Sequence, residues 1–362
     1  MRIGIGALVG ILGGPATYAR ELVRALAREA QHEYVVFTDR PEAFAGEPVE
    51  VVHVPLASSY HQVTWDHVRL PGLIRRHGVA LYHGTKAVLP LRCAVPAVVT
   101  VHDLAVYACP ETFAWPQRLH FRLCVPPSIA RAARVVAVSE HARGDVIAHF
   151  GLPPDRVIAV PNGVAEVFRS AVPPGTIDRL RGRHGLGERL VACVGTVQPR
   201  KHVERVIDAF GRAGGPSRGW QLAIAGRLRP GHAPSWTASP PAGVRWLGAL
   251  GDDDLHALYA AAPIFVSASE YEGFGLTVCE AMASGAAVVA VGASSLPEVV
   301  GDAGLLVQRS DAALLAPAIA KLIDDASLRA ELGTRARARA ARFTWDEAAR
   351  RTRTVYEQAV AS

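Results

Sequence analysis

Short apolar segments rich in β-branched residues alternate with helix patterns along the first half of this chain. Within 17–30 the residues Tyr18, Leu22 and Leu26 recur at helical spacing, which predicts an amphipathic helix. The apolar segments are RIGIGAL (2–8), EYVVFT (33–38), PAVVTVHD (96–103) and ARVVAVSE (133–140). Strands that alternate with helices build parallel sheets, so the chain is predicted to have an α/β fold.

The alternation breaks at a Pro/Gly-rich stretch, VPNGVAEVFRSAVPPGT, and then begins again. RLVACVGTV (189–197) starts a second series, and further strands are predicted at 220–226, 244–248, 263–269, 286–292 and 304–308. At roughly 150 residues per domain, a chain of 362 residues has room for two domains. We predict two facing Rossmann-like domains, 1–165 and 166–342, joined by a linker near 161–178 and followed by an amphipathic helix at 343–362. Ligands of such sheets bind at the carboxyl ends of the strands, so the cleft between the domains is the expected site.

Charge and cysteine content narrow the class of partner. The net charge of +6 is spread along the chain without a polybasic run, which argues against nucleic acid and is compatible with a phosphate-bearing substrate or a membrane surface. The five cysteines form no C-x-x-C pair and read as reduced thiols of a cytosolic protein. No run of about 18 apolar residues exists to span a membrane. We therefore expect a cytoplasmic protein, with peripheral contact at the inner membrane face left open.

The stretch SEYEGFGLTVCEAMASG (269–285) places two carboxylates, Glu272 and Glu280, around a glycine-rich turn. Thr277 and Glu280 have the spacing of a capping box, which gives Glu280 a structural explanation. Glu272 lies on a loop where the sequence gives no structural reason for a carboxylate. Free amides from Gly275 to Val278 would form an anion site, so a ligand with hydroxyls on both sides of a diphosphate, a nucleotide-sugar, fits the pattern.

Other candidates lie at the predicted carboxyl ends of strands. Arg200 and Lys201 in VGTVQPRKH stand where a helix begins, an unfavourable place for positive charge unless an anion binds there. Gly13 and Gly14 precede Pro15 and would direct their amides toward a ligand, although a tight turn explains them equally well. His102 closes the strand PAVVTVHD.

Two motifs resemble sites but have simpler explanations. Asp252, Asp253 and Asp254 match a D-x-D metal motif, yet they immediately precede LHALYAA and are interpreted as helix-capping acids. Gly4, Gly6 and Gly10 resemble a dinucleotide fingerprint with Asp39 as its ribose acid, but Gly4 and Gly6 fall inside a predicted strand.

The motif E-G-F-G-L-x-x-x-E-A-M-A-x-G resembles the signature of the retaining glycosyltransferases of family 4, which have the GT-B fold. The similarity continues in the family's order over almost the whole chain. It includes GGPATYARELVRAL, VVTVHDLA, AVSEHARGDVI, VPNGV, VGTVQPRKHVERVIDAF, VRWLGALGDDDLHALYAAA, SSLPEVVGDAGLLV and FTWDEA. The expected fold is therefore GT-B, with the last helix crossing back to the first domain.

The resemblance implies a role for each matching residue. Glu272 would meet hydroxyls of the donor sugar and Glu280 the ribose, while the family places a histidine, here His102, beside the donor sugar. The expected catalytic set is His102, Arg200, Lys201 and Glu272. The expected donor-binding set is Gly13, Gly14, Phe274, Gly275, Leu276, Thr277 and Glu280. Many family members carry an arginine where this chain has Thr196, so one diphosphate contact is missing or supplied elsewhere.

The expected activity is transfer of a hexose from a UDP-, GDP- or dTDP-sugar to a hydroxyl of a glycan, lipid-linked sugar or small glycoside, with retention and without metal or cofactor. The first domain would bind the acceptor, for which we single out 58–71 and 111–127, predicted loops that could equally be packed lids. An NAD-dependent oxidoreductase and a non-catalytic nucleotide-sugar-binding protein are the alternatives. The combination of His102, Arg200 and Lys201 favours an enzyme over a sensor.

Overall fold

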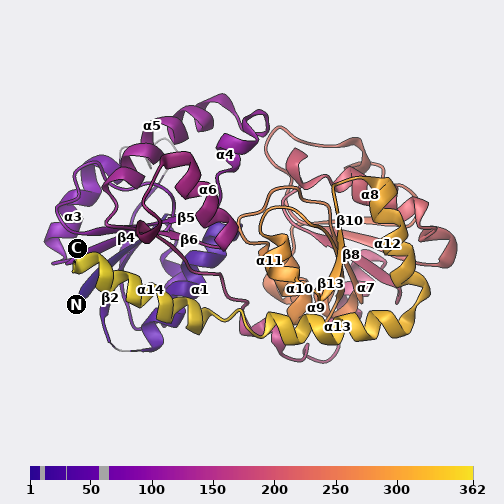
Figure 1. Cartoon of the computed structure of the whole chain (residues 1–362). Coiled ribbons are helices and arrows are strands. Elements are labelled where there is room, and N and C mark those ends of the chain that lie inside the picture. Colours follow the sequence, from indigo (N-terminus) through magenta and orange to yellow (C-terminus); the bar gives the residue numbers. More distant parts are fainter. Residues whose placement is uncertain (9–12, 30, 57–64, 362) are drawn as a thin grey trace. The chain divides into compact units, whose positions relative to one another are not determined.

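The chain forms two compact units in a computed structural model, which describes residues 1–8, 13–29, 31–56 and 65–361. Unit 1 comprises Met1–Gly163 and Thr344–Ser362, and unit 2 comprises Val164–Phe343. The sequence analysis placed the first boundary at 165/166 and the second at 342/343. The C-terminal segment thus belongs to the same unit as the N-terminal half of the chain (Figure 1).

Unit 1 is built on a parallel sheet whose described strands have the order β3-β2-β1-β4-β5-β6-β7. The strands are β1 (Arg2–Ala7), β2 (Glu33–Thr38), β3 (Glu50–His53), β4 (Leu81–Gly84), β5 (Ala97–Val101), β6 (Arg134–Ala137) and β7 (Val157–Ala159). The helices are α1 (Gly14–Arg28), α3 (Leu70–Arg76), α4 (Ala105–Ala108), α5 (Trp115–Arg131), α6 (Glu140–Phe150) and α14 (Trp345–Val360).

Unit 2 repeats the design with a parallel sheet of order β10-β9-β8-β11-β12-β13. The strands are β8 (Leu190–Val194), β9 (Gln221–Ala225), β10 (Val244–Gly248), β11 (Ile264–Ser267), β12 (Ala287–Val291) and β13 (Gly304–Val307). The helices are α7 (Thr176–His184), α8 (Val203–Arg212), α9 (Asp252–Ala261), α10 (Leu276–Ala283), α11 (Leu296–Val300), α12 (Ala312–Asp324) and α13 (Ala326–Ala340). Both sheets reverse their strand order beside the first strand, as in doubly wound folds.

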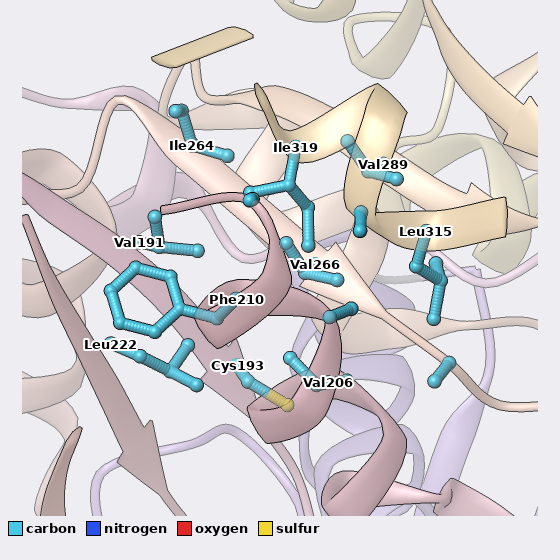
Figure 2. Packing of buried hydrophobic residues seen from close by; sticks show 14 of the residues in the cluster. Val191, Cys193, Val206, Phe210, Leu222, Ile264, Val266, Val289, Leu315 and Ile319 are labelled. Carbon is cyan, nitrogen blue, oxygen red and sulfur yellow. The ribbon is translucent and has the colours of Figure 1, made fainter. Parts of the chain in front are cut away.

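The central strands have unbroken apolar sequences because they are completely buried. Every residue of β5 and of β12 is buried, because helices cover both faces of a parallel sheet. In unit 2 one core cluster joins Val191 and Val266 of the sheet to Phe210 of α8 and Ile319 of α12 (Figure 2). This packing fixes the strand ends from which the loops of the candidate site emerge.

Helix α14 is attached to unit 1 by packing against α1 and by a buried polar cluster. The hydroxyl of Tyr356 lies 2.8 Å from Nδ1 of His83, whose Nε2 lies 2.7 Å from the hydroxyl of Thr100. Where the chain re-enters the unit, a Cβ on Gly163 would come within 2.2 Å of the Trp345 amide nitrogen, so this position requires glycine. The helix is thus an integral part of the first unit.

Several predicted loops are helical, and some strands were not predicted. Residues 65–69 form a π-helical turn (η2, Trp65–Arg69) leading into α3, and most of the segment 111–127 lies in α5, so the description of both segments as loops was wrong. Residues 58–64 of the first segment lie outside the described residues. The unpredicted strands β3, β4 and β7 have three or four residues each, too few to establish a period. In the described chain no helix is both long and apolar enough to cross a bilayer.

Burial, with a smaller contribution from His102, lowers the pKa of His83 to about 3. The folded protein therefore holds this imidazole neutral, whereas the unfolded chain takes up a proton near pH 6.5. This histidine costs no stability above that pH, and as the pH drops toward 3 it lowers the free energy of unfolding by about 1.4 kcal/mol per pH unit. With histidine ¹³C labelling, NMR should show one imidazole that stays neutral at pH 5 and disappears in His83→Gln. Its persistence in that variant, with loss instead in the exposed control His53→Asn, would contradict the assignment.

Candidate active site

Two loops at the carboxyl edge of the unit 2 sheet meet at the side chain of Glu272. Arg200 and Lys201 lie on a short 3₁₀ turn, Pro199–Lys201, between β8 and α8, and Glu272 follows β11. The Lys201 ammonium donates to the Glu272 carboxylate, and Nη1 of Arg200 lies 3.7 Å from its other oxygen. Arg200 also donates to the carbonyl of Tyr271. The structure thus brings together three of the four predicted catalytic residues.

The Glu272 carboxylate is held ionised in a buried position. Glu272 is 8% exposed. Burial raises its pKa, but Lys201 and Arg200 together outweigh burial, so the pKa lies below the ordinary glutamate value. The expectation that no structural reason exists for a carboxylate here was wrong, because Glu272 pairs with both cations. The buried carboxylate therefore lies between two cationic side chains.

Two serines from the loop after β12 fix the backbone of Glu272. The Ser294 hydroxyl accepts from the Glu272 amide at 3.1 Å, and it also donates to the Glu272 carbonyl. The neighbouring Ser295 hydroxyl donates to the same carbonyl at 2.9 Å. Ser294 has a φ of 57°, an uncommon conformation for a residue with a side chain. Strained backbone of this kind is typical of functional sites.

Helix α10 begins directly after this loop and presents its N-terminus to the same sheet edge. Gly275 is its N-cap with a φ of 93°, and a Cβ there would lie 2.6 Å from Leu296, so only glycine fits. Leu276 and Thr277 form the first turn, whose amides have no partner within the helix. Phe274 is buried and packs edge-on against Phe343. The predicted capping box was wrong, because the helix begins one residue before Thr277 and no side chain caps it.

Glu280 lies in the middle of α10 and is buried. Its Oε2 accepts a 2.9 Å hydrogen bond from the Tyr259 hydroxyl of α9. Burial and the nearby Glu280 carboxylate raise the pKa of Tyr259 well above its ordinary value, so the phenol remains a donor. Glu280 thus joins α10 to α9 through a hydrogen bond, and its position is not explained by capping.

Arg229 is a further cation at this edge that the sequence analysis missed. It lies on the loop after β9, where an isolated parallel bridge pairs Val197 with Leu228. Its Nη1 donates to the Gln198 side-chain oxygen at 2.9 Å, which places it beside the turn of Arg200. Burial first, and then Arg200, lower the pKa of Arg229. The sequence did contain a signal for this residue. The segment GRLRPG places an arginine just after a predicted strand, as VGTVQPRK does for Arg200 and Lys201.

The position where many similar chains carry arginine is occupied by the exposed Thr196. It borders a small pocket whose lining includes Gly195, Lys201 and Ala268. Gly195 and Gly226 lie so close that a Cβ on Gly226 would be 1.9 Å from the Gly195 carbonyl oxygen. The two loops that carry Arg200 and Arg229 are therefore held against each other by glycine contacts.

In unit 1 the remaining predicted residues lie at the carboxyl edge of its own sheet. His102 follows β5, and its Nε2 donates to the Thr85 carbonyl at 2.8 Å, which leaves Nδ1 as the acceptor nitrogen. Burial lowers its pKa, so the ring is neutral at pH 7. Gly13 is the N-cap of α1, with Gly14 and Pro15 in the first turn. Tyr18 of α1 stands edge-on to His102 at 4.9 Å, so the helix start and the histidine are neighbours.

The two competing motifs have structural explanations. The first turn of α9 contains Asp252, Asp253 and Asp254, whose negative charges interact favourably with the helix dipole. They do not cap the helix, because Gly251 is its N-cap. Asp254 pairs with Arg183. In the described part of the chain no group of three or more His, Cys, Asp or Glu side chains could hold a metal.

The glycines of the dinucleotide-like motif belong to the sheet. Gly4 and Gly6 lie inside β1, where a Cβ on Gly6 would be 2.0 Å from the Tyr82 hydroxyl. Their role is close packing, and Gly10 lies outside the described residues.

Comparison with known proteins agrees with this geometry. The family described as "Glycosyltransferase Family 4" matches residues 12–166, and "Glycosyl transferases group 1" matches residues 177–339. An O-antigen chain mannosyltransferase B of Escherichia coli is 31% identical over 289 residues, which cover 76% of this chain and 74% of that protein. A D-inositol 3-phosphate glycosyltransferase of Salinispora arenicola is 34% identical over 75% of this chain and 65% of its own length.

Solved structures share the fold over the full length. Anabaena HepE in complex with UDP-glucose aligns with a TM-score of 0.79 and 20% identity, covering 99% of both chains. WaaG, described as a glycosyltransferase involved in lipopolysaccharide biosynthesis, aligns with a TM-score of 0.73 and 19% identity, covering 98% of this chain and 99% of its own. Two Rossmann-like units with these neighbours identify the fold as GT-B, and the expectation from the sequence is confirmed. The chain belongs to the group 1 glycosyltransferases of family 4.

Proposed function

We propose that this glycosyltransferase moves a hexose from a nucleoside diphosphate sugar to an acceptor hydroxyl, with retention at the anomeric carbon and without a metal ion. The observation that carries the proposal is the gathering of three cationic side chains at the carboxyl edge of the unit 2 sheet. Arg200 and Lys201 pair there with the buried Glu272, and Arg229 lies beside the turn that carries Arg200. Like charges held together in a folded protein favour an anionic ligand, and a diphosphate supplies one.

Different residues of unit 2 bind different parts of the donor. The amides at the start of α10, from Gly275 to Thr277, are the natural partners of a phosphate. The carboxylate of Glu280 is assigned to a ribose hydroxyl, and that of Glu272 to hydroxyls of the sugar, because ionised carboxylates accept hydrogen bonds. Arg229 takes the part of the arginine that Thr196 replaces, because it reaches the diphosphate region from the next loop of the sheet.

The transfer step needs no protein nucleophile in this proposal. The bond between the anomeric carbon and the diphosphate oxygen breaks, the acceptor oxygen bonds to that carbon on the same face, and the acceptor proton passes to the departing diphosphate. Arg200, Lys201 and Arg229 stabilise the growing charge, so catalysis rests on positioning and electrostatics. The neutral His102 of unit 1, with Nδ1 as an acceptor, is assigned to a sugar hydroxyl.

A panel of UDP-, GDP- and dTDP-hexoses tests the function directly. A donor at 100 times its dissociation constant adds about 2.7 kcal/mol of stability, so the true donor should raise the melting temperature. Mannosyl donors come first, because a similar protein is named as a mannosyltransferase. Stabilisation without transfer or donor hydrolysis would favour the non-catalytic sugar-nucleotide-binding protein instead.

All five cysteines are free, and we place the reaction in the cytoplasm.

Substitution of Glu280 and of Glu272 should impair different steps, donor binding and sugar transfer respectively. Glu280→Ala should weaken binding of the free nucleoside diphosphate roughly 10- to 100-fold, because charged hydrogen bonds are worth about 1.5 to 3 kcal/mol. Glu272→Gln should leave that affinity nearly intact or raise it, since it removes the negative charge beside Lys201, and should reduce single-turnover transfer instead. Calorimetric titration with the diphosphate and rates with the full donor separate the two cases.

Tyr259→Phe is the control for the glutamate experiment, since it removes only the hydroxyl that Glu280 accepts from. Equal loss of diphosphate affinity in Glu272→Gln and Glu280→Ala would contradict the division of labour.

Removal of a cation should lower turnover more than it lowers donor affinity. Arg200→Ala and Lys201→Ala should each cost about 10²-fold or more in turnover, by analogy with loss of an oxyanion donor. Arg229→Gln should act in the same direction. The matched control is Arg227→Gln, an exposed arginine two residues upstream on the same loop. Steady-state kinetics in which Arg229→Gln behaves like Arg227→Gln would remove Arg229 from the site.

Turnover should survive chelation of divalent metal, since the proposal assigns the diphosphate charge to side-chain cations and helix amides. Asp253→Asn should likewise leave activity almost unchanged, because Asp253 lies in the first turn of α9. Activity measured with excess EDTA checks the first outcome. Loss of activity that Mg²⁺ or Mn²⁺ restores would show that the transfer depends on metal.

A further inference from the structure

The loops after β8 and β11 touch through three consecutive residues of each. Arg200 and Lys201 of the first loop bind residues 271–272 of the second, as described above. The third contact joins His202 to Glu270, with Nε2 of the imidazole 3.2 Å from Oε2 of the carboxylate. The proposed function uses the first two contacts and leaves the third without a role.

His202 has a backbone conformation that residues with a side chain rarely adopt. Its φ is 48° and its ψ is 44°, in the left-handed region. In the described part of the chain one other non-glycine residue has a positive φ, Ser294, whose hydroxyl binds the backbone of Glu272. Both residues thus hold the same short segment, 270–272. Backbone strain persists where surrounding contacts fix it, and it clusters at functional sites.

The left-handed turn at His202 connects Lys201 to a rigid element. His202 ends the 3₁₀ turn that carries Lys201, and it is also the N-cap of α8, although its side chain makes no capping hydrogen bond. Helix α8 is fixed in the core through Val206 and Phe210. The backbone angles of His202 therefore determine the direction in which Lys201 leaves the start of α8.

Glu270 is held from a second side as well. Its Oε1 accepts from Nη1 of Arg205 in α8 at 3.2 Å, and the same nitrogen donates to the Ser310 carbonyl. The Glu270 side chain is 45% exposed, and exposed ion pairs contribute little to stability. The contact with His202 is therefore explained by the position that it fixes and not by the stability that it adds.

We propose that His202 and Glu270 are positioning residues, which act on the transfer step by holding Lys201 where charge grows on the departing diphosphate. Neither side chain contacts the donor. Misplacement of a catalytic group by about 1 Å can cost about 10²-fold in rate, so a contact beside Lys201 can matter without touching the substrate. The inference rests on the function proposed above, because the pair affects transfer only through Lys201.

Release of nucleoside diphosphate from the UDP-, GDP- or dTDP-hexose that the enzyme turns over measures the effect. Glu270→Ala and His202→Gly should each lower kcat about tenfold and leave the donor KM within about twofold. Glycine adopts the left-handed conformation readily, so His202→Gly removes the imidazole without opposing the turn. The double variant should lose no more than either single variant, since both remove the same contact.

The matched control is Asp208→Ala, which should leave kcat unchanged. Asp208 is a carboxylate of α8 that pairs with Arg212, and its side chain is 51% exposed against 45% for Glu270. Melting curves establish that each variant is folded. An equal loss of kcat in Asp208→Ala would overturn the proposal, because the effect would then belong to any exposed ion pair of this helix.

Lys201→Ala provides the background that separates two kinds of failure. In that variant Glu270→Ala should lower kcat no further, because Lys201 is no longer present to be misplaced. Normal kcat in Glu270→Ala and His202→Gly, with kcat impaired in Lys201→Ala, would overturn the positioning role alone. Normal kcat in Lys201→Ala would refute the catalytic role of Lys201 and the positioning role with it. Additive losses in the double variant, or an undiminished effect of Glu270→Ala in the Lys201→Ala background, would also overturn the proposal.

Discussion

The pairing of Glu272 with Lys201 and Arg200 is the interaction on which the candidate site depends. The two cations offset the cost of burying the Glu272 carboxylate, and without it they would repel each other at the start of a helix. The pair also joins the loops after β8 and β11, while Ser294 adds the loop after β12. Binding of a diphosphate would compete with Glu272 for the same cations, so the carboxylate both assembles the site and tunes its charge.

The parallel sheets explain why these loops meet at all. Parallel strands end at the same edge, so side chains more than 70 residues apart in sequence, such as Arg200 and Glu272, arrive within contact of each other. Complete burial of the central strand β12 makes that edge rigid. Glycines at 226 and 275 then allow the loops to approach their neighbours more closely than any side chain would permit. Rigid elements supply the precision that a charge-based mechanism requires.

Much of this arrangement could be predicted from the sequence. The strand–helix period gave both sheets, and the strand-end rule located Arg200, Lys201, Glu272 and His102. The partner of Glu272 and the start of α10 at Gly275 could not be predicted, because side-chain pairing and helix caps depend on tertiary contacts. The short strand β4 was missed because LYHG carries a buried histidine whose partners, Thr100 and Tyr356, lie 17 and 273 residues away. Arg229 lay within reach of the same strand-end rule but was not singled out.

The return of α14 to unit 1 has a consequence for synthesis on the ribosome. Unit 2 is continuous in sequence, so it can fold as soon as residues 164–343 have emerged. Unit 1 begins first but is finished last, since its sheet must wait for Tyr356 to complete the hydrogen bonds of His83. Until then the nascent first unit exposes the apolar surface that α14 later covers. The half of the protein that is translated earliest is therefore the half that most needs protection by a chaperone.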